Sequence, residues 1–326
     1  MKSVIIDCDP GNGIPGANTD DGLALALALA SPGLRLELIT TVSGNTPSET
    51  GLAVAQDLVA RSGRAVPVVR GASEALVEPA EPWRAQLDRR VHENGLAGLW
   101  QGVAVPPKGP AGEPRAAQAM GELICARPGE ITLVAIGPLT NVALAMQLFP
   151  AMAGQVAEIV IMGGVFAVDH YLKDTNFGLD PEAAHKVLHS GARITLVPMD
   201  VTTQTLMTEA DLDRIAGLHT PLADYIAHTM RPWIAYAMQT RQLPGCWIHD
   251  ALAVAWLLDP SLVERAAFQV GIDLHAGPTR GRSWRVRHPL RLDVGIVLPP
   301  QPPITVLTQV DNVRLLALIN SVLANT

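Results

Sequence analysis

The sequence is poor in aromatic and charged residues, and it has no excess of positive charge. Phe, Trp and Tyr make up 4% of the 326 residues and charged side chains 17%, whereas apolar residues make up 48%. The formal net charge of −7 argues against a surface that binds nucleic acid or anionic membranes. The composition is typical of a globular protein with a large aliphatic core. We therefore expect a small molecule as its partner, with no role for nucleic acid or membrane.

Cysteines and long apolar runs are scarce as well. Cys8, Cys125 and Cys246 are widely spaced, so they form neither a metal-binding pair nor a disulfide framework, which is typical of a reducing compartment. The longest apolar run, Leu23–Ala30, is too short to span a bilayer. The first residues, MKSVIID, read as a strand and leave no room for a secretory signal. We therefore expect a cytoplasmic location.

Apolar runs rich in β-branched residues alternate with helical patterns along most of the chain. Strands are expected at 2–7, 34–42, 66–69, 131–136, 156–162 and 193–197, and helices from 19, from 48 and at 115–126, 139–148, 222–240, 251–258 and 310–324. This alternation predicts an α/β fold, with a mostly parallel, Rossmann-like central sheet flanked by helices. Strands near Phe268–Leu274 and Leu292–Val297 predict a small antiparallel addition. Because no linker or repeat divides the chain, we expect a single large domain, residues 1–326.

The stretch DCDPGNGIPGANTDDGLALALALA, residues 7–30, places four carboxylates where the first strand gives way to the first helix. Asp7 and Asp9 are two residues apart, so their side chains point the same way along a strand. Asp20 and Asp21 fall in the first helical turn, where acids complement the helix dipole. The dipole accounts for Asp20 or Asp21 alone, but it leaves Asp9 unexplained.

Glycine and polar residues also follow later strands. Gly44–Asn45, Gly137–Asn141 and Gly163–Gly164 each come after an expected strand. In a parallel sheet these strand ends border one crevice. Converging carboxylates repel one another unless a cation neutralises them, and oxygen ligands without a Cys or His pair favour Ca²⁺ or Mg²⁺. The sequence therefore predicts a hard-cation site, where a carboxylate beside a water could act as a general base.

Several short motifs follow one another along the chain in the order found in a known protein family. The strand ending in D-x-D-P-G, followed by D-D at a helix start, resembles the inosine–uridine-type nucleoside hydrolases, and the likeness extends from Val4 to about Pro260. The other similar stretches are LITTVSGN at 38–45, HENG at 92–95, GPLTN at 137–141, IMGG at 161–164, DPEAA at 180–184, PMDVT at 198–202 and HD at 249–250. The resemblance implies the nucleoside hydrolase fold and Ca²⁺-dependent hydrolysis of ribonucleosides to free base and ribose. It also implies a homodimer or homotetramer, as is common among the relatives.

By this resemblance the Ca²⁺ ligands are Asp9, Asp21, Asp250 and the backbone carbonyl of Ile136. The ion would hold the ribose 2′- and 3′-hydroxyls and the attacking water, and Asp9 would take the proton from that water. Cleavage of an N-glycosidic bond builds positive charge on the ribose ring, which a pocket lined with carboxylates stabilises. His249 would protonate the leaving base, because an imidazole titrates in the useful range.

The resemblance also implies which residues contact the ribose. Asp20 and Asn176 would bind its hydroxyls, Asn45 would lie close to the general base and the water, and Asp7 would support the cluster from behind. Asp174 replaces the usual glutamate near the 5′-hydroxyl. Its side chain is shorter by about 1.5 Å, which weakens the expected contact there.

The contacts to the base are open to two interpretations. His92 either contacts the base or belongs to the structure of its loop. Trp247, like Trp233 and Tyr236, either stacks on the base or packs in the core.

One insertion separates this chain from the family pattern. The family places its D-D pair four residues after the second Asp of the strand, whereas Asp9 and Asp20 are eleven apart here, with NGIPGAN at 12–18 between them. Its glycines and proline predict a turn-rich excursion. We expect this segment to bulge away from the cluster, to leave metal binding intact and to cover the mouth of the site.

Two other functions could use the same acidic residues. Haloacid-dehalogenase-type Mg²⁺ phosphatases also begin with D-x-D after a first strand, but that interpretation leaves GPLTN, DPEAA and the HD pair unexplained. A non-catalytic protein that binds nucleosides or ribose could keep the metal pocket, although the acids and His249 are all present.

Overall fold

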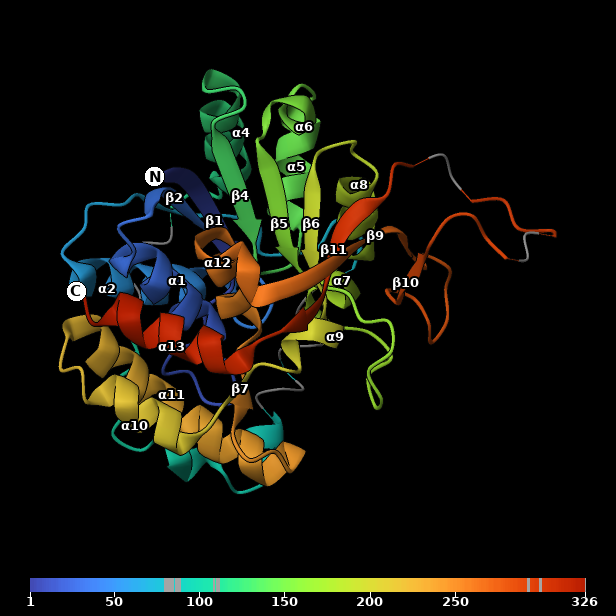
Figure 1. Ribbon diagram of the computed structural model, residues 1–326. Helices are drawn as coiled ribbons and strands as arrows, with labels where there is room; N and C mark the ends of the chain where they lie inside the picture. Colours follow the sequence, from blue (N-terminus) through green and yellow to red (C-terminus); the bar gives the residue numbers. More distant parts are fainter. Residues whose placement is uncertain are drawn as a thin grey trace.

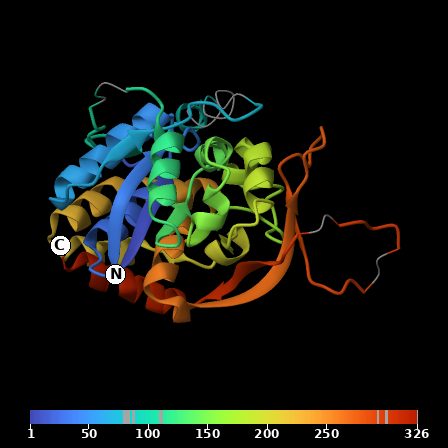
Figure 2. The same ribbon diagram turned by 90° about the horizontal axis from the view of Figure 1, so that it is seen from above.

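Figures 1 and 2 show the computed structural model, which describes residues 1–78, 85, 89–107, 109, 112–291, 294–298 and 301–325. Within these residues a nine-stranded sheet has the order β10-β9-β11-β6-β5-β4-β1-β2-β3. Neighbours from β3 to β11 are parallel, whereas β9 runs antiparallel to both β11 and β10. The prediction of a mostly parallel sheet with an antiparallel addition is therefore confirmed.

The strands of the large sheet are β1 Lys2–Cys8, β2 Leu34–Thr41, β3 Val68–Arg70, β4 Ile131–Ala135, β5 Glu158–Met162, β6 Ile194–Val197, β9 Val263–Ile272, β10 Ser283–Val286 and β11 Ile304–Val310, and a second sheet pairs β7 Leu206–Met207 with β8 Cys246–Trp247. The described helices are α1 Asp20–Ala30, α2 Ser48–Ser62, α4 Ala116–Ala126, α5 Thr140–Leu148, α6 Met152–Gln155, α7 Thr175–Leu179, α8 Pro181–Leu188, α9 Met199–Thr202, α10 Glu209–Ala216, α11 Pro221–Arg241, α12 His249–Leu258 and α13 Asn312–Leu323, with 3₁₀ turns at Ala97–Trp100 and Pro260–Leu262.

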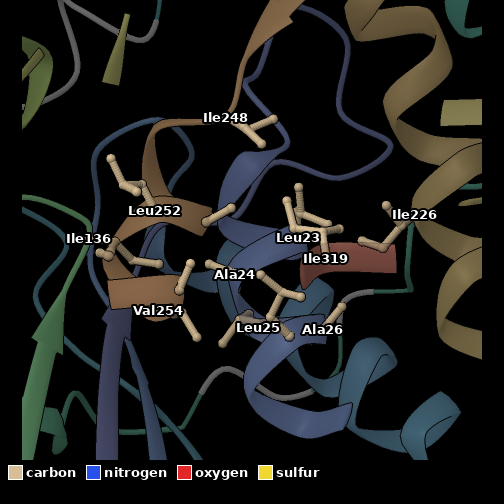
Figure 3. Packing of buried hydrophobic residues seen from close by; sticks show 14 of the residues in the cluster. Leu23, Ala24, Leu25, Ala26, Ile136, Ile226, Ile248, Leu252, Val254 and Ile319 are labelled. Carbon is tan, nitrogen blue, oxygen red and sulfur yellow. The ribbon is translucent and has the colours of Figure 1, made fainter. Parts of the chain in front are cut away.

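The sheet divides the core into two layers. Successive side chains of a strand point to opposite faces, so Val4 and Ile6 of β1 pack on one side and Ile5 on the other. On the first side lie α1, α2 and α11 to α13, and on the second lie α4, α5 and α8 (Figures 1 and 2). All eleven residues of α1 are buried, and Figure 3 shows its side chains between those of α12, α11 and α13. A helix enclosed in this way is apolar all round, which explains its alanine–leucine repeat.

Helix α11 is the longest, and its sequence sets both of its ends. The Thr220 side chain caps the first turn by accepting from Ala223 N, and Pro221 occupies the first helical position. The helix ends before Gln242, which has a left-handed backbone. No helix within the described part of the chain is both long enough and apolar enough to cross a bilayer.

The strand predicted near Leu292–Val297 is wrong. Val294–Val297 lie outside any strand and Val297 is 95% exposed, while Leu292 and Asp293 lie outside the described residues. The antiparallel partners of β9 are instead β10 and β11, which flank this segment on either side. Prolines at 289, 299, 300, 302 and 303 flank the segment, and because a proline has no N–H to donate, they disfavour extension of a strand through this region.

Candidate active site

The carboxyl ends of the central strands bring four loops together. Asp9 follows β1, Gly44–Asn45 follow β2, Ile136 follows β4 and Gly163 follows β5. Backbone hydrogen bonds hold these ends in register: Ile136 N donates to the Asp7 carbonyl at 2.8 Å and Val42 N donates to the Cys8 carbonyl at 3.0 Å. The polar residues that follow these strands therefore lie together at one edge of the sheet, as predicted.

Three carboxylates meet at the amino ends of two neighbouring helices. Asp20 and Asp21 belong to the first turn of α1, Asp250 belongs to the first turn of α12, and all three are buried. One carboxylate oxygen from each lies within 4.8 Å of the others. Asp250 N donates to Asp20 Oδ2 at 3.2 Å, and Asp9 N donates to Asp21 Oδ1 at 3.0 Å. Residues 230 positions apart thus form one group, which Asp9 joins through its backbone.

Burial dominates the electrostatics of this cluster. Burial raises the pKa of Asp9 to about 7 and of Asp20 to about 6, although N–H groups of Asn45 and Asp250 lower each in part. The pKa values of Asp21 and Asp250 are raised well above the usual range, first by burial and then by repulsion from the neighbouring carboxylates. Among the described residues no Lys or Arg forms an ion pair with these four acids. Oxygen donors that repel one another in this way fit a hard divalent cation, which would offset both costs.

Asp7 lies behind the cluster and is held by the chain itself. Its Oδ1 accepts from Thr40 Oγ1 at 2.6 Å and from Asn141 Nδ2 at 2.8 Å, and burial raises its pKa to about 7. Asn141, the last residue of GPLTN, also bonds the Thr41 carbonyl and Ala72 N. One amide therefore joins three segments behind the site, a role that the sequence analysis did not assign.

The predicted carbonyl ligand and the predicted ribose contact lie together. Asn176 Nδ2 donates to the Ile136 carbonyl at 2.7 Å and to the Met162 carbonyl at 3.0 Å. The carbonyl has a second lone pair, so this bond leaves room for another partner. Asp174 is 5% exposed and caps α7 by accepting from Phe177 N at 3.0 Å. Its Oδ1 is buried without a hydrogen-bond partner in the described part of the chain, and burial raises its pKa to about 6.

His249 is buried at the start of α12, next to Asp250. Its Nδ1 lies 2.6 Å from Thr202 Oγ1, so its Nε2 is the ring nitrogen left for other partners. Burial, with the positive charge of Arg241 as a second cause, lowers the pKa of His249 to about 3. Thr202 is the last residue of PMDVT, and the sequence analysis missed its contact with the imidazole. A hydroxyl on Nδ1 fixes the ring orientation and, since it can donate or accept, is compatible with either tautomer.

The candidate base contacts separate into two groups. Trp247 is half-buried, and its ring centroid lies 5.8 Å from that of His249 and 6.0 Å from that of Tyr171, a residue not singled out from the sequence. Trp233 and Tyr236 are buried and stack on each other at 5.5 Å, as core residues do. His92 is exposed, and it takes part in no hydrogen bond or ion pair of the acid cluster within the described residues.

The prediction that the insertion bulges away is wrong. Asn12 and Ala17 are 0% exposed, and Asn12 Nδ2 donates to Thr229 Oγ1 of α11 at 2.9 Å. The segment ends at Asn18, whose backbone pairs with the side chain of Asn45. A helix partner 217 residues away holds the insertion inside, which a local turn pattern does not reveal.

Known proteins resemble this chain over nearly its whole length. The sequence model of a family described as inosine-uridine preferring nucleoside hydrolase matches residues 4–317. The chain is 32% identical to a probable uridine nucleosidase 2 from Arabidopsis thaliana, over 98% of this chain and 96% of that protein. Two solved structures are similar: a plant nucleoside hydrolase, the PpNRh1 enzyme (TM-score 0.84, 28% identity, 99% of each chain), and a purine-preferring ribonucleoside hydrolase from Gardnerella vaginalis (TM-score 0.81, 30% identity, 99% and 98%). These matches favour neither a phosphatase nor a protein without catalysis.

Proposed function

Because the chain belongs to the inosine-uridine preferring nucleoside hydrolase family and is an N-ribosyl hydrolase, we propose that it is a Ca²⁺-dependent enzyme with its catalytic centre at the acid cluster. The observation that carries the proposal is the meeting of Asp20, Asp21 and Asp250 at the amino ends of α1 and α12. We assign Asp9, Asp21, Asp250 and the Ile136 carbonyl as Ca²⁺ ligands. The choice of Ca²⁺ rests on the all-oxygen donor set and on several carboxylates from separate segments, which suit its larger coordination sphere. A divalent cation bound there supplies Lewis-acid chemistry: it orients a sugar diol and makes a nearby water more acidic.

In this proposal Asp9 is the general base. Its Oδ2 accepts from Asn45 N at 2.6 Å, and the carboxylate held in this way would take the proton from the attacking water. Burial raises the pKa of Asp9 to about 7 in the metal-free protein, and a cation bound at the cluster would lower this pKa, so that the carboxylate is ionised and able to accept a proton at pH 7. The carboxylates around it also stabilise the positive charge that develops on the ribose ring more than they stabilise the neutral substrate.

His249 assists departure of the base. Its lowered pKa keeps the imidazole neutral at pH 7, and its Nδ1 faces the Thr202 hydroxyl. With Nδ1 accepting from that hydroxyl, the proton lies on Nε2, which donates toward the leaving base. The neutral ring therefore acts as a hydrogen-bond donor that stabilises the negative charge building on the leaving base, and its low pKa argues against the full proton transfer expected from the sequence.

Substrate contacts come from neighbouring loops. We assign Asp20 and Asn176 to the ribose hydroxyls and Asp174, whose Oδ1 is a buried acceptor, to the 5′-hydroxyl. Trp247, beside His249, borders the base, and His92 remains a prediction from the sequence. The relatives carry both uridine and purine preferences in their names, so either class of base is compatible with the family.

The test is release of free base from uridine and inosine by an Asp9→Asn variant. Loss of the general base should lower kcat by about 10³-fold, because the amide cannot accept the proton. The Glu37→Gln variant, which removes a carboxylate from the opposite end of the sheet, serves as the matched control and should keep normal turnover. A folded Asp9→Asn protein with near-normal turnover would reject the mechanism.

The proposal also covers the number of domains, the cellular location and the oligomeric state. We propose one domain for residues 1–326, because the sheet runs without interruption from β3 to β10 and uses strands from both halves of the chain. Limited proteolysis tests it, since two domains would release stable fragments. A cytoplasmic location and a homodimer or homotetramer stay predictions, which fractionation of the source cells and light scattering of the purified protein would check.

A further inference from the structure

The proposed mechanism makes no use of the insertion, here named the 12–18 loop. Its chain turns back on itself, with Ile14 N donating to the Gly11 carbonyl at 3.0 Å and Ala17 N donating to the Ile14 carbonyl at 3.1 Å. Gly11 has no room for a side chain, because a Cβ atom there would collide with Ala17 and with the Asn18 carbonyl. The start and the end of the loop are therefore packed against each other. This compact form is unlike a flap over an active site.

The loop is anchored at both ends by asparagines. At its start, Asn12 donates to Thr229 of α11. At its end, Asn18 N donates to Asn45 Oδ1 at 2.9 Å, and Asn45 Nδ2 donates back to the Asn18 carbonyl at 2.9 Å. Such a pair of reciprocal bonds fixes the plane of the Asn45 amide, whereas a single bond would leave it free to rotate.

Asn45 in turn holds the proposed general base. Its Nδ2 also lies 3.2 Å from the Asp9 carbonyl, and its backbone N–H donates to Asp9 Oδ2 at 2.6 Å. Gly44 packs against the same carboxylate oxygen so closely that a Cβ atom would collide with it. The peptide that joins Gly44 to Asn45 thus sets the position of the Asp9 carboxylate, and the Asn45 side chain sets the position of that peptide.

We propose that the 12–18 loop is a positioning device for the Asp9 carboxylate and that it acts through Asn45. The inference rests on the proposed function, since it takes Asp9 as the base. The amide of Asn45 is engaged with backbone groups of Asp9 and Asn18, which makes Asn45 a positioning residue and revises its prediction as a substrate contact. A misplacement of about 1 Å at a reacting group can cost about a hundredfold in rate, so a fixed carboxylate has a direct catalytic value.

The first test compares Asn45→Ala with Asn12→Ala, a matched change that removes the loop's other anchor, to Thr229, and leaves in place the Asn18–Asn45 bonds that lead to Asp9. We expect Asn45→Ala to lower kcat for uridine and inosine by about 10- to 100-fold, with KM changed by less than about threefold. Asn12→Ala should lower the melting temperature to a similar degree and keep kcat within about twofold. Binding of Ca²⁺ alone, followed by calorimetry, should be weaker in Asn45→Ala than in Asn12→Ala, because Asp9 is also a proposed ligand, and kcat is therefore measured at saturating Ca²⁺.

The second test changes the loop and leaves Asn45 intact. Asn18→Gly keeps the backbone N–H and carbonyl that bind Asn45, so kcat should stay near that of the native enzyme. Asn18→Pro removes the donating N–H and should lower kcat. If the proline variant does not fold, the comparison of Asn45→Ala with Asn12→Ala decides alone.

Three results would overturn the inference: unchanged kcat in Asn45→Ala, a raised KM with kcat preserved, or a fall in kcat that follows the melting temperature in every variant. The Asp9→Asn variant in the same assay separates this failure from a failure of the proposed function. If Asp9→Asn is inactive and Asn45→Ala is normal, the positioning role alone is wrong. If Asp9→Asn is active, the proposed base itself is wrong.

Discussion

The carboxylates at the two ends of the central sheet have pKa values shifted in opposite directions. At the amino ends of the strands, Glu37 of β2 lies 2.6 Å from Arg35 Nε and 2.8 Å from Arg127 Nη1. Burial alone would raise the pKa of Glu37, but hydrogen bonds from Arg127, Ser3 and Arg35 outweigh it and lower the pKa. At the carboxyl ends, burial raises the pKa values of the clustered aspartates, and repulsion between carboxylates adds to this at Asp9, Asp21 and Asp250.

The difference shows what each group of acids is built for. Glu37 serves the fold, and the chain supplies Arg35 and Arg127 beside it. Where the aspartates gather around α1 and α12, the described residues supply hydrogen bonds and a more distant positive charge from Arg241, but no ion pair. Several buried carboxylates without a counter-ion are costly to the fold, so the cluster fits a cation from outside the chain.

Removal of the cation should have the largest effect. Treatment with a chelator that prefers Ca²⁺ should lower uridine hydrolysis by about 10³-fold or more, because several kcal/mol of charge stabilisation and water activation are lost. Added Ca²⁺ should restore the rate. Full activity after dialysis against chelator, with the calcium content measured as zero, would contradict the claim that the aspartates at the carboxyl ends of the strands act through a bound cation.

Replacement of His249 should have the next largest effect, and the effect should depend on the leaving group. His249→Ala should lower kcat on uridine by about 10²-fold, since loss of a positioned proton donor is typically this costly. On p-nitrophenyl riboside, whose leaving group needs no proton, the rate should change little. An equal loss on both substrates would contradict the assigned role. Thr202→Val should show a weaker form of the same pattern, because it frees Nδ1 of the ring.

The pH dependence of stability should differ between the metal-free and the Ca²⁺-loaded protein. In the metal-free protein the folded-state pKa values of Asp9 and Asp20 are raised from the ordinary 3.8 to about 7 and about 6, so the folded form binds protons more tightly than the unfolded form. Their contribution to the free energy of unfolding is therefore complete below about pH 4 and is lost as the pH rises through 6 and 7. The melting temperature of chelated protein should fall over this range, by about 2–4 °C for each kcal/mol lost. The Ca²⁺-loaded protein should not show this fall, and parallel curves for the two forms would argue against the cluster as the cation site.

The smallest effect is expected at the opposite end of the sheet. Arg127→Met breaks the contacts to Glu37 and Glu130, which are partly exposed ion pairs. Such pairs contribute little, so the melting temperature should fall by less than about 3 °C and kcat should stay unchanged. A large loss of activity in this variant would mean that the two ends are coupled.

Features with a local sequence pattern could be predicted from the sequence. The acids Asp9, Asp20 and Asp21 are close together in the chain, and the alternation of strands and helices brings their segment to the carboxyl edge of the sheet. Asp250 came only from the resemblance, because nothing near it in the chain says that α12 packs beside α1. The first helix itself was predicted from its alanine–leucine repeat and begins within one residue of the expected position.

The features that sequence reasoning missed depend on distant partners. Thr202 reaches His249 across 47 residues, Asn141 reaches Asp7 across 134, and Asn12 reaches Thr229 across 217. Each is a small polar side chain whose role is decided by what packs against it. The prediction that the 12–18 loop bulges away failed for this reason. Glycine and proline indicate turns, but they do not indicate whether the turn packs against the protein or points away from it.

The central claim is that the aspartates at the carboxyl edge of the sheet hold one divalent cation. Isothermal titration of chelated protein with Ca²⁺ at pH 7 tests it most directly, with an Asp21→Asn, Asp250→Asn double variant and Arg127→Met titrated alongside. We predict one site per chain in the native protein and in Arg127→Met, with release of protons on binding, and no site in the double variant. Equal binding by all three proteins, or none by any, would contradict the account.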